Sequence, residues 1–279
     1  MLQNITRYIT GIFRYALKPV ILTYCLVFSA CSIVVEKDSA PSRPVDVSNM
    51  PDAVPKEEPR SKYGNPKSYV VLGKRYYVLD SSKGYVERGI ASWYGTKFHG
   101  RRTSSGETYD MYAMTAAHKT LPLPTYVEVT NLENYRSAVV KVNDRGPFHE
   151  NRIIDLSYAA ATKLGIVAKG TGLVEVRAID PATYNRSKVI PVRNIPEPDH
   201  GLPQFYIQIG AFSQRANAEN TRQKVSSIGD SLVKISEAAV DGKILYRVRI
   251  GPLASVEYAD KIVGQLAQLG IYDHHIVLD

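Results

Sequence analysis

Three side chains in the middle of this 279-residue chain have the chemistry to break a glycosidic bond. Glu107 ends the loop-forming run TSSGE, Asp144 follows an alternating apolar segment, and His118 lies between them in the sequence. Breaking such a bond needs an acid for the leaving oxygen and a carboxylate that stabilises or deprotonates the reacting groups. One acid on a loop and one at a strand end would supply that pair.

Each of these residues has a second interpretation. Asp144 precedes Arg145 and can form a loop-organising ion pair with it, and Glu107 can be a solvated loop residue. His118 can be a histidine whose polar atoms are satisfied inside the domain. Placed acids are only candidates for catalysis, so spacing alone leaves both interpretations open.

Short strands must position these residues. A helix interrupts them, with Ser157 as its N-cap and Gly165 as its stop. Many short strands with one small helix predict a compact β-barrel over residues 86–180. Strands are indicated by apolar residues, often alternating with polar ones, in 69–79 (a pair around Gly73), 89–94, 126–130, 137–142 and 173–179.

The tail contains an internal repeat, because the apolar run at 207–212 recurs at 248–253. Each copy reads as a strand, a glycine-marked turn, an amphipathic helix and another strand. Residues 204–279 are therefore predicted to form a small α+β domain with βαββαβ order. Polar residues that alternate with apolar ones are expected on its open sheet face, where they suit sugar hydroxyl groups or are simply solvated: Tyr206, Gln208, Arg247 and Arg249.

Residues 1–30 have the features of an export signal. Basic residues come first, an apolar stretch runs from Val20 to Ala30, and small residues precede Cys31. The stretch is shorter than the ~20 residues of a spanning helix, although an uncleaved anchor is the alternative. Cys31 resembles the lipidated cysteine of a bacterial lipobox. We therefore expect the chain to work in the cell envelope, with no nucleic acid partner.

Two segments read as linkers. Residues 31–60 are rich in proline, serine and acidic residues and predict a disordered tether, and residues 181–203 predict a second, proline-rich linker. The region between them carries most of the chain's positive charge. A basic surface attracts anionic polymers of the envelope, and it is equally compatible with ordinary solubility.

Five motifs follow one another within residues 86–180: GIASWYG at 89–95, TSSGE at 103–107, MTAAHKTLP at 114–122, VNDRGPF at 142–148 and RIIDLS at 152–157. In this order they closely resemble the rare lipoprotein A (RlpA) family. The resemblance implies a mainly β fold, a six-stranded double-psi β-barrel, followed by a tail that resembles the SPOR domain.

The resemblance also implies a reaction. Active family members are lytic transglycosylases that cut peptide-free (denuded) peptidoglycan strands and leave a 1,6-anhydro end, without cofactor or metal. By position, Glu107 is the general acid, which needs a pKa raised by burial. Asp144 stabilises positive charge at the anomeric carbon or takes the proton of the muramyl 6-hydroxyl. His118 positions an acid or the sugar.

Further residues are assigned to the substrate or to the fold. Trp93 and Tyr94 are expected to stack on sugar rings, although strand alternation places one of them in the core. Arg145 is assigned to the substrate beside Asp144. Asp155 is expected to brace the barrel or to cap the following helix.

The same resemblance implies a location. The chain would be an outer-membrane lipoprotein held through lipidated Cys31, facing the periplasm and enriched at the division septum by its tail. Denuded glycan strands and division-site proteins are the expected partners. Two alternatives are a non-catalytic glycan-binding lipoprotein and a non-lytic factor that loosens the wall.

Overall fold

The computed structural model describes residues 38–42, 46, 50–149, 151–184, 204–229, 231–240 and 242–278. The predicted signal at 1–30, Cys31 and residues 185–203 of the second linker lie outside these ranges. Within them, no helix has the length and apolar character needed to cross a membrane.

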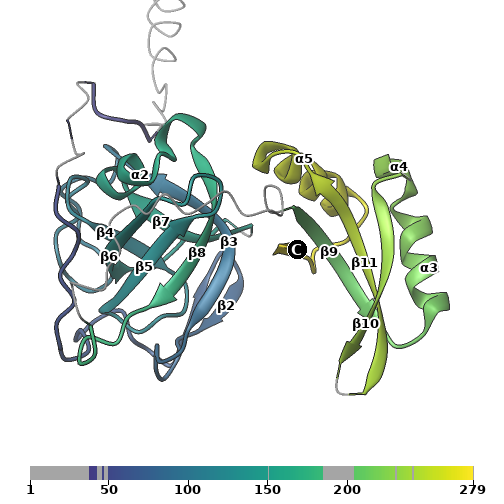
Figure 1. Cartoon of the computed structure of the whole chain (residues 1–279), viewed down its shortest axis with the longest axis horizontal. Helices are drawn as coiled ribbons and strands as arrows, with labels where there is room; N and C mark the ends of the chain where they lie inside the picture. The colour runs from purple at the N-terminus through teal and green to yellow at the C-terminus, as the bar shows by residue number, and fades with distance from the viewer. Residues whose placement is uncertain are drawn as a thin grey trace, which may run out of the picture. The chain divides into compact units, whose positions relative to one another are not determined.

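Six strands close into a barrel in the order β3-β7-β4-β6-β5-β8 (Figure 1). The β3–β7 and β4–β6 pairs are parallel, and the other neighbours are antiparallel. The predicted six-stranded barrel is therefore confirmed. Its strands are β3 (Val86–Tyr94), β4 (Thr115–His118), β5 (Thr125–Asn131), β6 (Ser137–Asp144), β7 (Arg152–Ser157) and β8 (Thr171–Ala178).

Alternation along these strands builds the core. Inward positions carry β-branched and other apolar side chains, such as Val127, Val140 and Val176, which are fully buried. Helix α2 (Tyr158–Leu164) begins after Ser157, whose hydroxyl accepts a hydrogen bond from Ala160 N, and it ends at left-handed Gly165. Both predicted helix boundaries are confirmed. A short 3-10 turn, η1 (Val167–Lys169), leads from α2 to β8.

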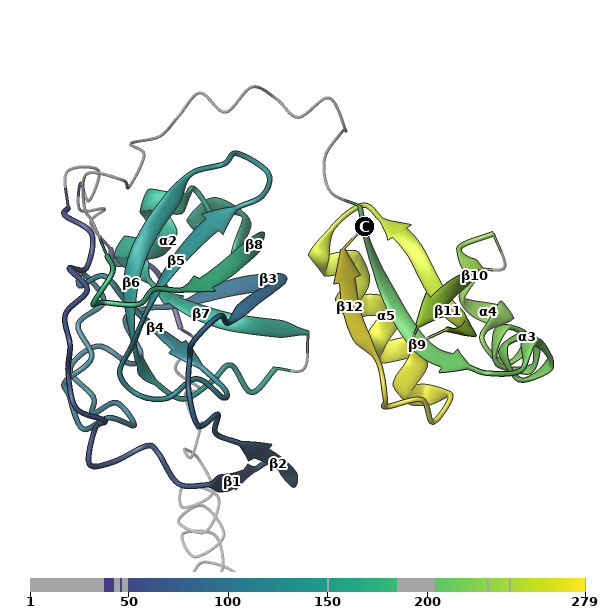
Figure 2. The ribbon, with the colours of Figure 1, turned by 60° about the horizontal axis from the view of Figure 1, so that its bottom comes forward.

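A small hairpin precedes the barrel. Strands β1 (Ser68–Val71) and β2 (Lys74–Tyr77) form their own two-stranded sheet, drawn apart from the barrel strands in Figure 2. The turn between them uses Leu72 and Gly73, both with positive φ. The strand pair predicted around Gly73 is present.

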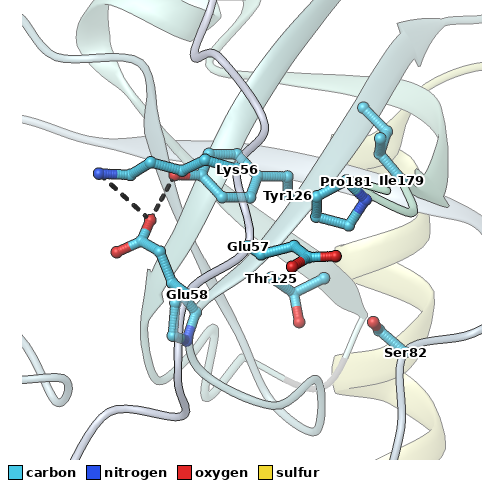
Figure 3. A pocket seen from close by; sticks show the side chains of 9 residues that line it. Lys56, Glu57, Glu58, Ser82, Thr125, Tyr126, Ile179 and Pro181 are labelled. Carbon is cyan, nitrogen blue, oxygen red and sulfur yellow. Dashed lines mark hydrogen bonds and ion pairs between the residues drawn. The ribbon is translucent and has the colours of Figure 1, made fainter. Parts of the chain in front are cut away.

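The predicted tether ends earlier than residue 60. Residues 50–60, here called the strap, lie against the barrel: Ala53 N donates to Val139 O at 3.0 Å, and Lys163 Nζ lies 2.7 Å from Asp52 Oδ1. Figure 3 shows Glu58 close to Tyr126, whose hydroxyl donates to Glu58 Oε1 at 2.5 Å. Prolines favour extended backbone, and an extended segment can pair its remaining polar groups with a neighbouring strand.

The tail forms one four-stranded antiparallel sheet in the order β10-β11-β9-β12. Helices α3 and α5 pack on it through Ala218, Ile262 and Leu266, which are fully or almost fully buried. The predicted βαββαβ order is confirmed, with α4 as an added turn. The elements are β9 (Phe205–Phe212), α3 (Arg215–Lys224), α4 (Ser226–Gly229), β10 (Val233–Val240), β11 (Lys243–Leu253), α5 (Val256–Gln268) and β12 (His275–Leu278).

Candidate active site

A tight loop brings Glu107 back to strand β6. Thr103 N donates to Glu107 O at 2.8 Å, and Gly106 adopts the positive φ that this turn requires. Glu107 Oε1 then lies 2.7 Å from Lys141 Nζ, and Oε2 lies 2.7 Å from Asn143 Nδ2. Both carboxylate oxygens are therefore held by donors from β6.

These contacts set the charge of Glu107. Partial burial on its own would raise the pKa of Glu107, but the hydrogen bonds from Asn143 and Lys141 and the Lys141 charge outweigh it and lower that pKa. The direction is opposite to the one expected for a general acid. Glu107 is an ionised carboxylate at neutral pH.

Asp144 lies at the same end of β6. Its Oδ1 accepts hydrogen bonds from Ser104 N at 2.7 Å, Ser104 Oγ at 2.6 Å and Arg145 N at 2.7 Å. In the part of the chain that the structure describes, Oδ2 has no hydrogen-bond partner. The loop that carries Glu107 thus also holds Asp144, and the structure brings the two predicted acids to one strand end.

A β-bulge re-aims Asp144. In the β4–β6 pair, Ala116 lies opposite Val142 but Ala117 lies opposite Asp144, so Asn143 is the extra residue. A bulge of this kind bends the strand and redirects a side chain. Asp144 therefore lies in register with Ala117.

His118 faces away from both acids. It is only 2% exposed, and its Nδ1 accepts hydrogen bonds from Thr120 N at 3.1 Å and Leu121 N at 3.0 Å. Two donors on Nδ1 place the ring proton on Nε2, which lies 2.9 Å from the Tyr85 hydroxyl oxygen. Burial lowers the pKa of His118, although nearby Glu87 opposes this. The ring is neutral and satisfied within the barrel.

Arg145 uses its guanidinium inside the protein. Nε donates to Gly64 O at 2.8 Å, and Nη1 donates to Leu121 O at 2.6 Å and His118 O at 3.1 Å. These bonds fasten the segment before the hairpin to the β4–β5 connection. The sequence assigns Arg145 to the substrate, whereas in this structure Nε and Nη1 donate to backbone carbonyls and Nη2 donates to Asn65 Oδ1 at 3.2 Å.

Comparison with known proteins identifies the family. Residues 86–177 match a family model described as lytic transglycolase, and residues 202–277 match the SPOR domain. A protein named endolytic peptidoglycan transglycosylase RlpA, from Pseudomonas aeruginosa (strain UCBPP-PA14), is 42% identical over 269 residues, covering 79% of this chain and 78% of its own length. One of the same name from Vibrio cholerae is 41% identical, covering 90% and 93%.

The chain belongs to the RlpA family. Its barrel is a double-psi β-barrel of the lytic transglycosylase type, and the chain is an enzyme of that class. A crystal structure of the RlpA SPOR domain from Pseudomonas aeruginosa is 29% identical, covers 26% of this chain and 96% of its own, and gives a TM-score of 0.25.

Trp93 and Tyr94 of this RlpA chain divide as strand alternation requires. Tyr94 is 8% exposed, and its ring stacks on Tyr109 with centroids 4.1 Å apart. Trp93 is half-buried and meets Tyr158 edge-on at 5.9 Å. Of the two aromatic residues, Trp93 is the more exposed.

Asp155 is the acid that sequence reasoning left out of the site. It lies on β7 in register with Ser92 of β3 and Ala117 of β4, and Ser92 Oγ donates to its Oδ1. Ser157, not Asp155, caps the helix, so the capping alternative is wrong. The one available signal was a polar residue between the core residues Ile154 and Leu156, which places Asp155 on the outer face of the barrel wall.

The SPOR sheet gathers three of its four predicted polar residues. Arg249 Nε donates to Gln208 Oε1 at 3.2 Å, and the Arg249 guanidinium lies 6.0 Å from the centre of the Tyr206 ring. Arg247 lies two positions along β11, opposite Ala211. Alternation with buried Ile207, Val248 and Ile250 is as predicted, although Gln208 is itself buried, at 8% exposure.

Within the described ranges, no group of three or more His, Cys, Asp or Glu side chains is arranged to hold a metal ion.

Proposed function

We propose that this chain cleaves the β-1,4 bond between N-acetylmuramic acid and N-acetylglucosamine in denuded peptidoglycan strands and leaves a 1,6-anhydro end. The observation that carries the proposal is the pair of carboxylates at one end of β6. Glu107 and Asp144 are held there by a single loop, on the barrel of a lytic transglycosylase family. Relatives at 41–42% identity are named endolytic peptidoglycan transglycosylases.

The contacts favour specific roles for the two acids. Positive charge develops at the anomeric carbon when the bond breaks, and an ionised carboxylate stabilises it. Asp144 suits this role because its Oδ1 is anchored by three donors while Oδ2 is left for the substrate. Glu107 is ionised and faces Lys141, so it binds sugar or stabilises charge and does not donate the proton. The proton donor is then a third group.

His118 and Arg145 stabilise the backbone next to the site. The His118 ring fixes the turn at Thr120 and Leu121, and Arg145 binds the carbonyl groups of His118 and Leu121. Together they hold β4 in place beside β6. We assign both as positioning residues.

The tail supports the proposed location. A SPOR domain at 202–277 and the polar row of Tyr206, Gln208 and Arg249 suit binding to glycan strands, and septal enrichment follows if denuded strands gather there. Attachment to the outer membrane through Cys31 rests on the export signal. Division-site proteins are proposed as further partners because of the proposed septal location.

A direct product assay tests the function. The full-length protein in detergent is incubated with glycan strands stripped by an amidase, and the products are identified by mass spectrometry. Anhydromuramyl ends are expected. Reducing muramyl ends would make the protein a hydrolase, and binding without cleavage would favour the non-catalytic glycan-binding alternative.

A further inference from the structure

We propose that Asp155 is a further catalytic residue, the one that protonates the leaving oxygen opposite Asp144. This inference rests on the proposed function and names the proton donor that Glu107 does not supply. It is carried by strand register, by free carboxylate oxygens and by the space between them.

Strand register places the two aspartates in one row. Ala117 of β4 lies opposite Asp155 of β7 on one side and opposite Asp144 of β6 on the other. Residues directly opposite in a sheet have their side chains on the same face, and neighbouring strands lie about 4.8 Å apart. The two aspartate Cα atoms are therefore roughly 10 Å apart across a single alanine. Carboxyl pairs that flank a scissile sugar bond are about 5–9.5 Å apart. Two aspartate side chains on Cα atoms at this separation can place their carboxyl groups within that range.

The residues between the aspartates leave room for a sugar oxygen. Ala117 has only a methyl group, and Gly146 has no side chain. A Cβ atom at Gly146 would lie 3.9 Å from Asp155 Oδ2 and 3.8 Å from Ala117 Cβ. Those distances are ordinary van der Waals contacts, so the glycine leaves space for one atom of that size beside Oδ2.

Each aspartate keeps one oxygen available. Asp155 Oδ1 accepts the hydrogen bond from Ser92, and Oδ2 has no hydrogen-bond partner among the residues the structure describes. Asp144 has the same arrangement, with Oδ1 bound and Oδ2 without a hydrogen-bond partner in the described part of the chain. Both aspartates also lie near Tyr94. Burial is the main cause that raises the pKa of Tyr94, and the negative charges of Asp144 and Asp155 raise it further.

The surroundings of the acids push their protonation in opposite directions. Burial raises the pKa of Asp155, and this outweighs the Ser92 hydrogen bond and nearby positive charges. The pKa of Glu107 is lowered instead. Pairs of acids with opposite shifts mark the donor and the ionised partner in carboxylate enzymes. The titratable or charged groups around Asp155 are Arg152, Lys119, His149, Asp144, Tyr94 and Tyr109.

The proposed reaction uses the muramyl 6-hydroxyl in place of water. The bond between the muramyl anomeric carbon and the glucosamine O4 breaks, its electron pair stays on O4, and Asp155 gives O4 its proton. Asp144 stabilises the positive charge at the anomeric carbon. The muramyl 6-hydroxyl oxygen then bonds to that carbon, and its proton passes to the Asp155 carboxylate. Asp155 ends protonated, as it began.

The test compares three variants with the full-length wild type in the product assay. Asp155→Asn is expected to lower the rate of anhydromuramyl formation by about 100-fold or more, the usual contribution of a general acid. Asp180→Asn is the matched control. Asp180 is exposed and follows the end of β8 that is remote from Asp144 and Asp155. This variant should cleave like the wild type.

Ser92→Ala tests the chemical role of Asp155 through the pH–rate profile. If Asp155 only stabilised the fold, this profile would not shift. The substitution removes a hydrogen bond that favours the charged form of Asp155, so the pKa of Asp155 rises. Since the donor must be protonated, the alkaline limb of the pH–rate profile should move to higher pH. This variant decides the matter if Asp155→Asn fails to fold.

The outcomes separate the two proposals. Wild-type activity in a folded Asp155→Asn protein, or an alkaline limb unmoved by Ser92→Ala, would overturn the role of Asp155 while leaving the function intact. A wild type that makes no anhydromuramyl ends would overturn the proposed function itself.

Discussion

Lys141 joins Glu107 to the strap. Its ammonium group lies 2.7 Å from Glu107 Oε1 and 3.2 Å from Glu58 Oε2. Burial on its own would lower the pKa of Lys141, but the bonds to Glu107 and Glu58 outweigh it and raise that pKa. The cation is therefore permanent at neutral pH, and together with the Asn143 hydrogen bond it lowers the pKa of Glu107.

Replacing Lys141 should change the pH dependence of cleavage. In Lys141→Met the pKa of Glu107 rises toward its ordinary value, because a donor and a positive charge are lost. Glu107 works as a carboxylate, so the acidic limb of the pH–rate profile moves to higher pH. Lys163→Met is the control, since Lys163 pairs with Asp52 of the strap instead. If the acidic limb stayed in place, Glu107 would not be the group whose ionisation sets it.

Glu107→Gln should separate chemistry from binding. The amide keeps the size of the side chain but loses the charge. We expect the cleavage rate to fall by about 100-fold, the order found when one stabilising group is removed from an active site. Binding of the full-length protein to glycan strands, measured by pelleting, should persist through the SPOR domain. Glu133→Gln, which alters an ion pair with Lys169, is the control. Full cleavage by Glu107→Gln would exclude a role in the reaction.

Local patterns were sufficient for most elements of this fold. Apolar and alternating residues predicted four of the six barrel strands, β3, β5, β6 and β8, whereas β4 and β7 were not assigned as strands from the pattern. Ser157 and Gly165 predicted both ends of α2, because capping depends on residues within one turn. The repeat of 207–212 at 248–253 predicted the SPOR order for a similar reason. Each copy contains the whole pattern of its own strand and helix.

Relations between distant strands were not visible in the sequence. Asp155 and Asp144 share a row only because the bulge at Asn143 shifts β6 by one residue against β4. The pKa of Glu107 depends on Lys141, which lies far along the chain, so a rule based on burial gave the wrong direction. The strap was predicted as disordered because its composition is polar, while its order comes from partners on β5, β6 and α2.

His118 should affect stability in a defined pH window. Its pKa is lowered in the folded protein, so the unfolded chain binds more protons below its own pKa of about 6.5. Stability is therefore full above pH ~6.5 and declines as the pH falls toward the folded pKa. His118→Phe should abolish this decline and cost roughly 2–5 kcal/mol at neutral pH, because the buried N–H of Leu121 and the part-buried N–H of Thr120 lose their acceptor.

Denaturant unfolding of the full-length protein between pH 5 and 8, the range in which a histidine changes charge, measures both effects. His149→Gln serves as the control because His149 is exposed. If His118→Phe unfolded like the wild type but lost cleavage, His118 would act in the chemistry and not as a positioning residue.

Arg249 should decide how tightly the SPOR sheet holds glycan. Its guanidinium is oriented by Gln208 and lies over the Tyr206 ring, so the cation is held at a defined place in the predicted polar row. Losing a hydrogen bond from a charged group costs about 1.5–3 kcal/mol, so Arg249→Ala should weaken binding to denuded strands by roughly 10- to 100-fold and reduce septal enrichment of a fluorescent fusion. Arg215→Ala is the matched control, because Arg215 lies on α3 and its ion pairs with Glu219 and Glu237 are exposed. Equal binding by the two variants in a pelleting assay would show that the polar row is an ordinary solvated face.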